Sequence, residues 1–150
     1  MKKESAFSVD TPEESSGFLL WQVTSLWQRE IRNALVVFDL THSQFVLMAS
    51  MLWLSQTDGE ITQVVLSNHT KIDPMTTSTV LRTLQKKGLL ERHEHATDTR
   101  AKTVTLTPKG KEVTKLAIVA VEKFDKAFFT ALGAGTSDFN KMCLLLLEKH

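Results

Sequence analysis

The sequence has little cysteine, proline and glycine, and it has no tyrosine. Of its 150 residues, one is Cys, three are Pro and six are Gly. A single cysteine excludes an internal disulfide framework, which fits a reducing compartment. Scarce Gly and Pro argue against a turn-rich β fold and favour long helices. Because 42% of the residues are hydrophobic, the chain has enough apolar material for one compact domain with a core.

Long apolar runs are also missing. No run reaches the ~18 residues that a membrane-spanning helix needs. Residues 1–16 are polar and lack the apolar segment of a secretory signal peptide. We therefore expect a flexible N-terminal arm over 1–16, a cytoplasmic protein and no membrane partner.

The sequence signatures of common enzyme classes are absent. The chain contains no G-x-S-x-G, no H-E-x-x-H, no P-loop and no Gly-rich dinucleotide turn. We expect no catalytic activity, no catalytic residues, no cofactor and no metal.

Charge is nearly balanced overall, at +1, but it is distributed unevenly. Residues 82–115 carry nine of the 18 basic residues against four acidic ones, whereas residues 1–60 carry four basic and eight acidic residues. A local surplus of cations is typical of a surface that binds a polyanion. A solvated surface region gives the same pattern, so charge alone leaves both interpretations open.

The spacing of apolar residues predicts a mainly α-helical chain with one small β-hairpin. Helices are expected over 17–38, 42–56, 63–69, 74–87, 109–132 and from about 137 to 149, and strands over 89–95 and 103–107. The predicted helix starts have good N-caps, which are Thr41, Thr62, Asp73 before Pro74, Thr107 before Pro108, and Thr136 or Ser137. Asp58-Gly59 and Gly133-Ala134-Gly135 are predicted turns or breaks, and Gly88 follows its helix as a C′ residue.

A short helix, a tight turn, a capped helix and a hairpin in this order predict a winged helix-turn-helix, which we place at 41–108. We expect the helices of 17–40 and 109–150 to be dimerisation helices within one compact domain. The last helix supports this, because residues 142–147 (MCLLLL) cover nearly its whole perimeter with apolar side chains. A helix that is apolar all round must be buried all round, and a second copy is the expected cover.

The helix 74–87 is the predicted DNA-reading element. Thr77, Val80, Leu81 and Leu84 share the core-facing side. An α-helix fits the major groove, where hydroxyls can hydrogen-bond base edges and Arg can take guanine in a bidentate fork. The candidate DNA contacts are Met75, Thr76, Thr77, Ser78, Thr79, Arg82 and Lys86. Hydroxyls also gather at helix starts because they cap well, and that alternative stays open here.

The hairpin is the second predicted reader. Asp98, Arg100 and Lys102 lie at or beside its tip. A narrow A·T minor groove attracts an inserted Arg. Asp98 either holds Arg100 in an ion pair or caps the turn. A solvated hairpin tip is the alternative.

Three segments together resemble the MarR (multiple-antibiotic-resistance regulator) family. They are KKGLLER at 86–92, DTRAK at 98–102 and LTPKG at 106–110. The resemblance implies an obligate homodimer, recognition helices in successive major grooves, wing arginines in flanking minor grooves, and commonly a small-molecule or oxidant signal that weakens DNA binding. The family's wing arginine corresponds to Arg100 and its aspartate to Asp98. Many members have Arg where this chain has Thr79, and Ala where it has Ser67, so no operator sequence is carried over.

Sensor chemistry has several candidates. The family's ligand pockets lie between the dimer helices and the reading head, where Trp27 and Trp53 can line one, although aromatic residues on a helix stripe are more often core. Cys143, among Met and Leu, is expected to be inert. His93, His95 and Glu91 share one strand face, which is a possible metal set but also an ordinary polar face.

The sequence thus predicts a sequence-specific regulator that binds double-stranded DNA as a homodimer on a pseudo-palindromic operator. We expect a repressor that responds to a small apolar or aromatic effector. The alternatives are a winged-helix module for protein contacts and a constitutive architectural DNA binder without an effector.

Overall fold

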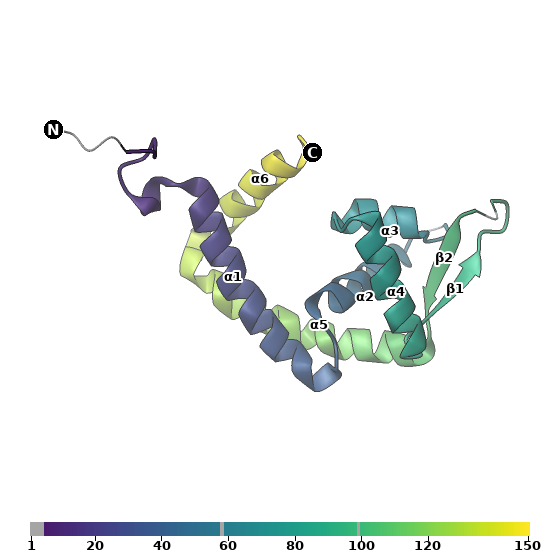
Figure 1. The fold of residues 1–150 in the computed structure, drawn as a ribbon. Helices are drawn as coiled ribbons and strands as arrows, with labels where there is room; N and C mark the ends of the chain where they lie inside the picture. Colours follow the sequence, from purple (N-terminus) through teal and green to yellow (C-terminus); the bar gives the residue numbers. More distant parts are fainter. Residues whose placement is uncertain (1–4, 58, 99) are drawn as a thin grey trace.

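The computed structural model describes residues 5–57, 59–98 and 100–150 (Figure 1). Residues 1–4 of the predicted arm, Asp58 of the predicted turn and Thr99 of the predicted hairpin connection lie outside the described residues. The elements in chain order are η1 (Pro12–Glu14), α1 (Ser16–Leu35), η2 (Val36–Phe38), α2 (His42–Leu54), α3 (Gln63–Thr70), α4 (Pro74–Lys86), β1 (Leu90–Glu94), β2 (Lys102–Leu106), α5 (Pro108–Phe129), η3 (Thr130–Gly135) and α6 (Thr136–Leu147). The predicted mainly helical fold with one hairpin is confirmed.

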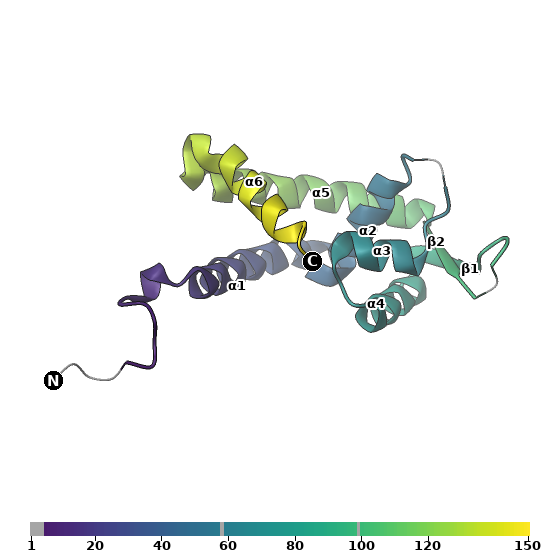
Figure 2. The ribbon, with the colours of Figure 1, turned by 90° about the horizontal axis from the view of Figure 1, so that it is seen from above.

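Helix α5 connects the two parts of the molecule (Figures 1 and 2). Its first half packs against α2 and β2, and α1 packs along it as well. At its far end, η3 reverses the chain so that α6 folds back above α5 (Figure 2). Helices α2, α3 and α4 and the hairpin therefore lie at one end of α5, and α6 lies with the first half of α1 at the other.

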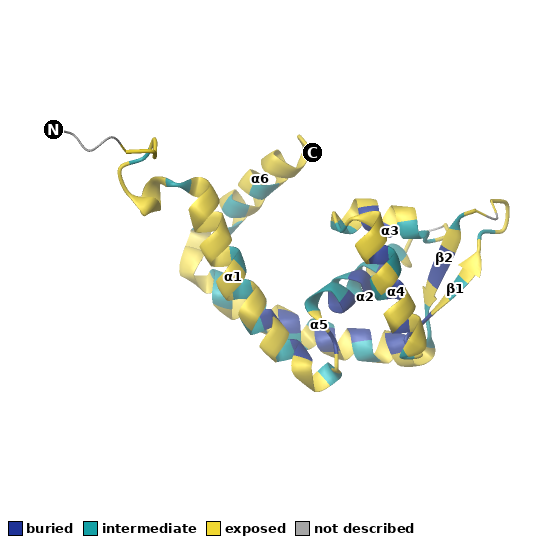
Figure 3. Ribbon diagram, in the orientation of Figure 1, coloured by how far each residue is buried: buried dark blue, intermediate teal, exposed yellow. Residues whose placement is uncertain are grey.

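The core occupies the first of these parts. Figure 3 shows the buried residues gathered where α2, α4, α5 and the end of α1 meet, whereas α6 and the start of α1 are exposed or half-buried. The fully buried large side chains are Ile31, Leu35, Leu47, Met48, Met51, Leu66, Leu81, Leu84, Leu90 and Val104. They come from both helices and strands, so the helix-turn-helix and the hairpin share one core.

Side-chain caps fix most of the helix starts, as predicted. Thr41 and Gln44 form a reciprocal capping box at α2, and Thr62 accepts from the Val65 N–H at α3. Thr107 accepts from the Gly110 N–H at 3.0 Å. The prediction for α6 was wrong. Its N-cap is Gly135, without a side-chain cap, because η3 runs directly into α6 and the chain reverses at Gly133, with φ 53° and ψ −127°.

The first long helix ends earlier than its apolar spacing predicts. The α-helix stops at Leu35, and residues 36–38 tighten into η2. Asp39 then adopts a left-handed conformation with φ 53°. Lys87, at the end of α4, donates to the Asp39 carbonyl oxygen and lies 3.4 Å from its carboxylate. This contact ties the end of α4 to the corner between α1 and α2.

The hairpin has a third backbone neighbour. Strands β1 and β2 are antiparallel, with Leu90 opposite Leu106 and Glu94 opposite Lys102. Ahead of α3, Ile61 accepts a hydrogen bond from the Val104 N–H at 2.8 Å, and Thr62 forms a bridge with Thr103. The segment before α3 therefore fixes the position of β2.

Gly88 and Gly110 are two of the glycines that the local backbone requires. Gly88 ends α4 with φ 73°, the left-handed conformation expected of a C′ residue. Gly110, in the first turn of α5, approaches the Leu89 carbonyl so closely that a Cβ atom there would lie 1.9 Å from that oxygen. The start of α5 is thus packed directly on the backbone that leads into the hairpin.

Within the described part of the chain, no single helix is long and apolar enough to cross a membrane. The segments Ser16–Phe38 and His42–Leu54 satisfy the length and composition only together, across a bend of 75°.

Candidate nucleic-acid interface

Helix α4 presents one buried and one exposed face. Asp73 caps it by accepting from the Thr76 N–H at 2.9 Å. Hydrogen bonds with the side chain and then the backbone of Thr76 lower the pKa of the Asp73 carboxyl below its usual value. Leu81 and Leu84 are fully buried. The exposed side carries Met75, Thr76, Thr79, Arg82, Thr83 and Lys86. The helix therefore offers hydroxyls, a guanidinium and an ammonium to solvent along a single face.

Hydrogen bonds along this face orient its polar groups. The Arg82 guanidinium donates to the Ser78 hydroxyl at 2.9 Å. The Thr79 hydroxyl donates to the Met75 carbonyl at 3.0 Å. A hydroxyl that donates in this way keeps its lone pairs, so it can still accept a hydrogen bond from a base amino group. Both hydrogen bonds lie within α4 itself.

Thr77 does not belong to this surface. Its side chain is fully buried, and its hydroxyl donates to the Ile72 carbonyl at 3.4 Å. The expectation that Thr77 contacts DNA is corrected, because a side chain with no exposed area cannot reach a duplex while the helix stays packed. Its place is the core-facing stripe that the helical spacing also predicts.

The hairpin tip brings the predicted wing residues together in part. Asp98 caps the turn, since its Oδ1 accepts from the Arg100 N–H at 3.1 Å. Arg100 is exposed. Lys102 lies on β2, and its ammonium is 3.8 Å from Glu94 on the facing strand. Of the two predicted wing cations, Lys102 already has a carboxylate neighbour and Arg100 extends from the turn.

Arg92 is a cation at this surface that the sequence reasoning missed. It lies on β1, which packs against α4. Its Nε is buried and has no hydrogen-bond partner. Burial lowers the pKa of Arg92 below its ordinary value, and the charge of nearby Arg82 lowers it further. Two guanidinium groups that repel one another at a surface favour the binding of an anion such as phosphate. Arg92 is the last residue of the KKGLLER segment, so the sequence did contain this cation. Its position near Arg82 could be found only in the structure.

A groove of about 450 Å³ lies between α1, α2 and the turn before α4. Its lining includes Trp27, Arg32, His42, Val46 and Ile72. This size suits a small-molecule ligand. Trp53 is not among the lining residues and is 66% exposed, so the structure brings Trp27 to the groove but not Trp53.

The polar groups of the groove form a short chain. The Trp27 indole N–H donates to Asp125 on α5 at 2.8 Å, and the Trp27 ring meets the His42 ring edge-on, with centroids 5.0 Å apart. Burial lowers the pKa of His42, an effect that Asp125 opposes and Arg32 reinforces. Neutral His42 and charged Arg32 thus lie beside one aromatic wall.

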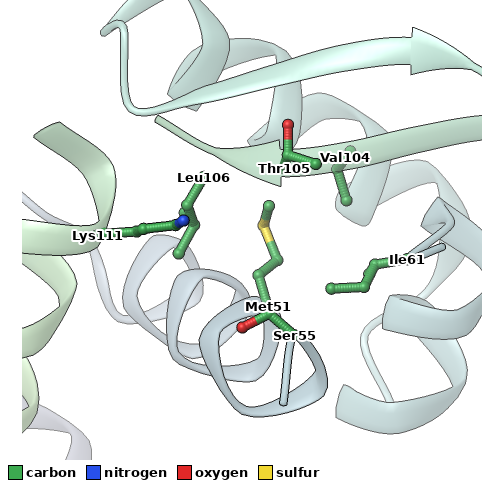
Figure 4. A pocket seen from close by; sticks show the side chains of 7 residues that line it. All are labelled: Met51, Ser55, Ile61, Val104, Thr105, Leu106 and Lys111. Carbon is green, nitrogen blue, oxygen red and sulfur yellow. The ribbon is translucent and has the colours of Figure 1, made fainter. Parts of the chain in front are cut away.

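A second, smaller cavity of about 110 Å³ lies between α2 and β2 (Figure 4). Met51 extends from α2 toward the strand, with Ile61 on one side and Lys111 at the edge (Figure 4). This volume is below the range of typical ligand pockets. The cavity is a packing gap behind the wing.

The histidines of the strand face do not converge. His93 pairs with Glu91 at 3.2 Å, whereas His95 pairs with Glu60, from the segment before α3, at 2.8 Å. Among residues 5–57, 59–98 and 100–150, no three metal-ligating side chains come together. Cys143 is half-buried on α6.

Many of the exposed apolar side chains lie on α1 and α6, and together they are called the apolar surface of α1 and α6. Its side chains are between 41% and 70% exposed, and they are Phe18, Leu19, Leu20, Trp21, Val23, Leu26, Met142, Leu144, Leu145, Leu146 and Leu147. Large exposed apolar patches on a protein mark interaction surfaces.

Comparison with known proteins agrees with this geometry. Residues 37–123 match the family described as ArnR1-like, winged-helix domain. The chain is 44% identical over 120 residues to the HTH-type transcriptional regulator YdcH of Bacillus subtilis, covering 80% of this chain and 82% of that protein. It is 30% identical over 118 residues to the HTH-type transcriptional repressor Rv2887 of Mycobacterium tuberculosis, covering 79% and 82% of the two chains.

Solved structures share the fold. The wild-type apo MarR from Escherichia coli, 25% identical, has a TM-score of 0.66 and covers 90% of this chain and 96% of its own. The Staphylococcus aureus MepR–DNA complex, 20% identical, has a TM-score of 0.79 with the same coverage. CouR from Rhodococcus jostii bound to p-coumaroyl-CoA, 18% identical, has a TM-score of 0.75 and covers 91% and 93% of the two chains.

Proposed function

Because the chain belongs to the MarR family of winged helix-turn-helix transcriptional regulators, we propose that it represses transcription as a ligand-responsive homodimer on a pseudo-palindromic operator. The carrying observation is the exposed face of α4, which is rich in hydroxyls and cations and lies beside a cationic hairpin. Such a regulator works where the chromosome is, so we place it in the cytoplasm.

Helix α4 reads the major groove in this proposal. Thr76 and Thr79 accept from or donate to base edges, and Arg82 takes a guanine. Met75, 78% exposed at the first turn, offers an apolar contact to a thymine methyl. Lys86 and Arg92 neutralise phosphates on either side of the groove, which positions the helix without reading sequence.

The hairpin supplies the second contact. Arg100 leaves the turn at its tip and enters the adjacent minor groove, where a narrow A·T segment has the most negative potential. The backbone that carries Arg100 is held by Asp98, so less conformational entropy is lost when the side chain inserts.

The apolar surface of α1 and α6 supports the homodimer. A lone protomer leaves Trp21 70% and Leu146 67% exposed. A second copy that packs the same surface against itself covers both, with the two-fold symmetry that a pseudo-palindromic site requires.

The groove beside Trp27 supports effector binding. It combines an aromatic wall, neutral His42 and the Arg32 cation, which suits a small aromatic molecule with a polar or anionic substituent. It also touches Ile72, whose carbonyl holds the turn into α4. A ligand there acts on the position of the reading helix. CouR is a fold relative solved with an aromatic acyl-CoA bound, and Rv2887 is named a repressor.

The test is a titration of the purified protein against its own upstream promoter DNA across a salt series. We expect a steep fall of affinity with salt, with a slope that corresponds to ~6–10 phosphates per dimer. A flat slope, or no complex, contradicts DNA binding and favours a module for protein contacts. Equal affinity for random DNA favours an architectural binder.

A further inference from the structure

The imidazole of His95 is bonded through both of its nitrogens at the root of the wing turn. Its Nδ1 accepts from the backbone N–H of Thr97 and from that of Asp98, each at 3.2 Å. Its Nε2 lies 2.8 Å from Glu60 Oε2. Because Nδ1 accepts twice, the ring proton is on Nε2 and is donated to the carboxylate.

This ring organises the backbone that carries Arg100. His95 and Ala101 close the hairpin through the bond from the His95 N–H to the Ala101 carbonyl, at 3.1 Å. Inside that closure the ring caps Asp98 N–H, and Asp98 in turn accepts from the Arg100 N–H. The bonds form an unbroken series from His95 to Arg100.

Glu60 connects the series to the rest of the fold. It precedes Ile61, whose carbonyl accepts from the Val104 N–H, and Thr62, which caps α3. The frame that supports the helix-turn-helix therefore also holds the His95 ring. The His95 side chain is 27% exposed, against 56% for His93 on β1, two residues earlier in the chain.

We propose that His95 and Glu60 form a latch that positions Arg100 for DNA, which makes His95 a positioning residue and not a DNA contact. The inference rests on the proposed function, since it needs Arg100 to contact DNA. Without the ring, the Thr97 and Asp98 amides lose their shared acceptor, and the turn samples orientations in which Arg100 misses the minor groove. Part of the binding free energy is then spent on ordering the turn.

Side-chain chemistry supplies matched variants. H95A removes both bonds. H95N keeps an amide oxygen near the position of Nδ1 and restores the acceptor for the turn. E60A removes the connection to the frame. H93A is the control, because it removes an imidazole two residues away, on β1, whose ring pairs with Glu91.

The first measurement is operator affinity in a double-mutant cycle with R100A. H95A and E60A should weaken binding about fivefold, H95N less, and H93A not at all. In the R100A background, H95A should cause no further loss, because the latch acts through Arg100. Wild-type affinity for H95A, losses that multiply with R100A, or H95N no better than H95A each overturn the latch. Absence of any wild-type complex overturns the proposed function itself.

The second measurement needs no DNA. Trypsin cleaves after Arg100, and cleavage requires a turn that can leave its native conformation. H95A should be cut at Arg100 several-fold faster than the wild type and H93A, at unchanged thermal midpoint. Equal cleavage rates for all three proteins contradict the latch.

Discussion

The hydroxyl of Ser67 donates to the carbonyl oxygen of Ile72 at 2.6 Å, across the turn that joins α3 to α4. Thr77 donates to the same oxygen from the other side, at 3.4 Å. Both hydroxyls are on buried residues. One carbonyl thus joins the two helices of the DNA-binding unit, and the same residue borders the groove beside Trp27.

Replacing Ser67 by Ala should weaken this turn. The change removes one buried hydrogen bond and adds no bulk, so the free energy of unfolding should fall by about 1 kcal/mol. Urea denaturation at constant m-value measures this. Ser55→Ala, which removes an exposed hydroxyl that also bonds a backbone carbonyl, is the control and should cost less. An equal decrease in the free energy of unfolding in both variants would contradict a particular contribution of the Ser67–Ile72 hydrogen bond.

Arg92→Met should separate phosphate contact from base reading. The Met side chain keeps the apolar length of the half-buried stem, and loss of the charge should reduce the salt slope by about 1 for each protomer, equally on operator and random DNA. Arg82→Ala should instead cost about 1–3 kcal/mol on the operator and little on random DNA. Lys123→Met, on the far half of α5, is the charge-matched control. An unchanged salt dependence of DNA affinity in Arg92→Met would contradict a phosphate contact by Arg92.

Arg100→Ala should weaken operator binding several-fold and leave the oligomeric state unchanged. Lys102→Ala should have a smaller effect, because the Glu94 carboxylate that faces Lys102 across the hairpin offsets part of its attraction for phosphate. Fluorescence anisotropy with a labelled operator compares the two. If Lys102→Ala is the more damaging, the assignment of the wing cation is reversed.

Leu146→Glu should dissociate the dimer. Leu146 is 67% exposed in the protomer, so the change leaves the protomer core intact and places a charge in the proposed interface. Analytical ultracentrifugation should show monomers, and operator affinity should fall more than tenfold as one half-site is lost. Gln56→Glu adds the same charge outside α1 and α6 and should remain dimeric. A dimeric Leu146→Glu protein would move the interface elsewhere.

His42 should make stability depend on pH. Because burial lowers its folded pKa below the ordinary 6.5, the unfolded chain takes up a proton that the folded protein does not as pH falls below about 6.5. The free energy of unfolding should therefore decrease below pH 6.5 until the folded pKa is passed. Urea midpoints between pH 7.5 and 5 test this. The decrease should be smaller in His42→Gln, and an identical profile would rule out His42 as its source.

Local signals were sufficient to predict most of the helix starts. Caps such as Asp73 with Pro74 and Thr107 with Pro108 act within three residues, so they can be found in the sequence and the structure confirms them. The core side of α4 followed from helical spacing in the same way. Thr77 shows the limit of residue type as a guide, because its position in the stripe decided its burial and its hydroxyl did not.

Contacts between distant residues could not be predicted. His95 and Glu60 meet because the segment before α3 pairs with β2. No local sequence pattern around either residue predicts this contact. Trp53 is an aromatic residue on α2, the helix that also supplies His42 and Val46 to the groove. It is nevertheless not among the residues that line the groove. The end of α1 also depends on a distant partner, since Lys87 from α4 binds Asp39 at the corner.

Gly110 sets the direction of α5 relative to the backbone that leads into the hairpin. The first turn of α5 lies flush on the Leu89 carbonyl because no methyl group separates them. A Cβ atom at position 110 would push the start of α5 away from this carbonyl and tilt the whole helix. From Gly110 to Phe129 the helix extends about 28 Å, so a tilt of about 5° at its start displaces its far end by roughly 2–3 Å. In a symmetric pair both halves would shift, and the two recognition helices would fall out of step with the pitch of the duplex.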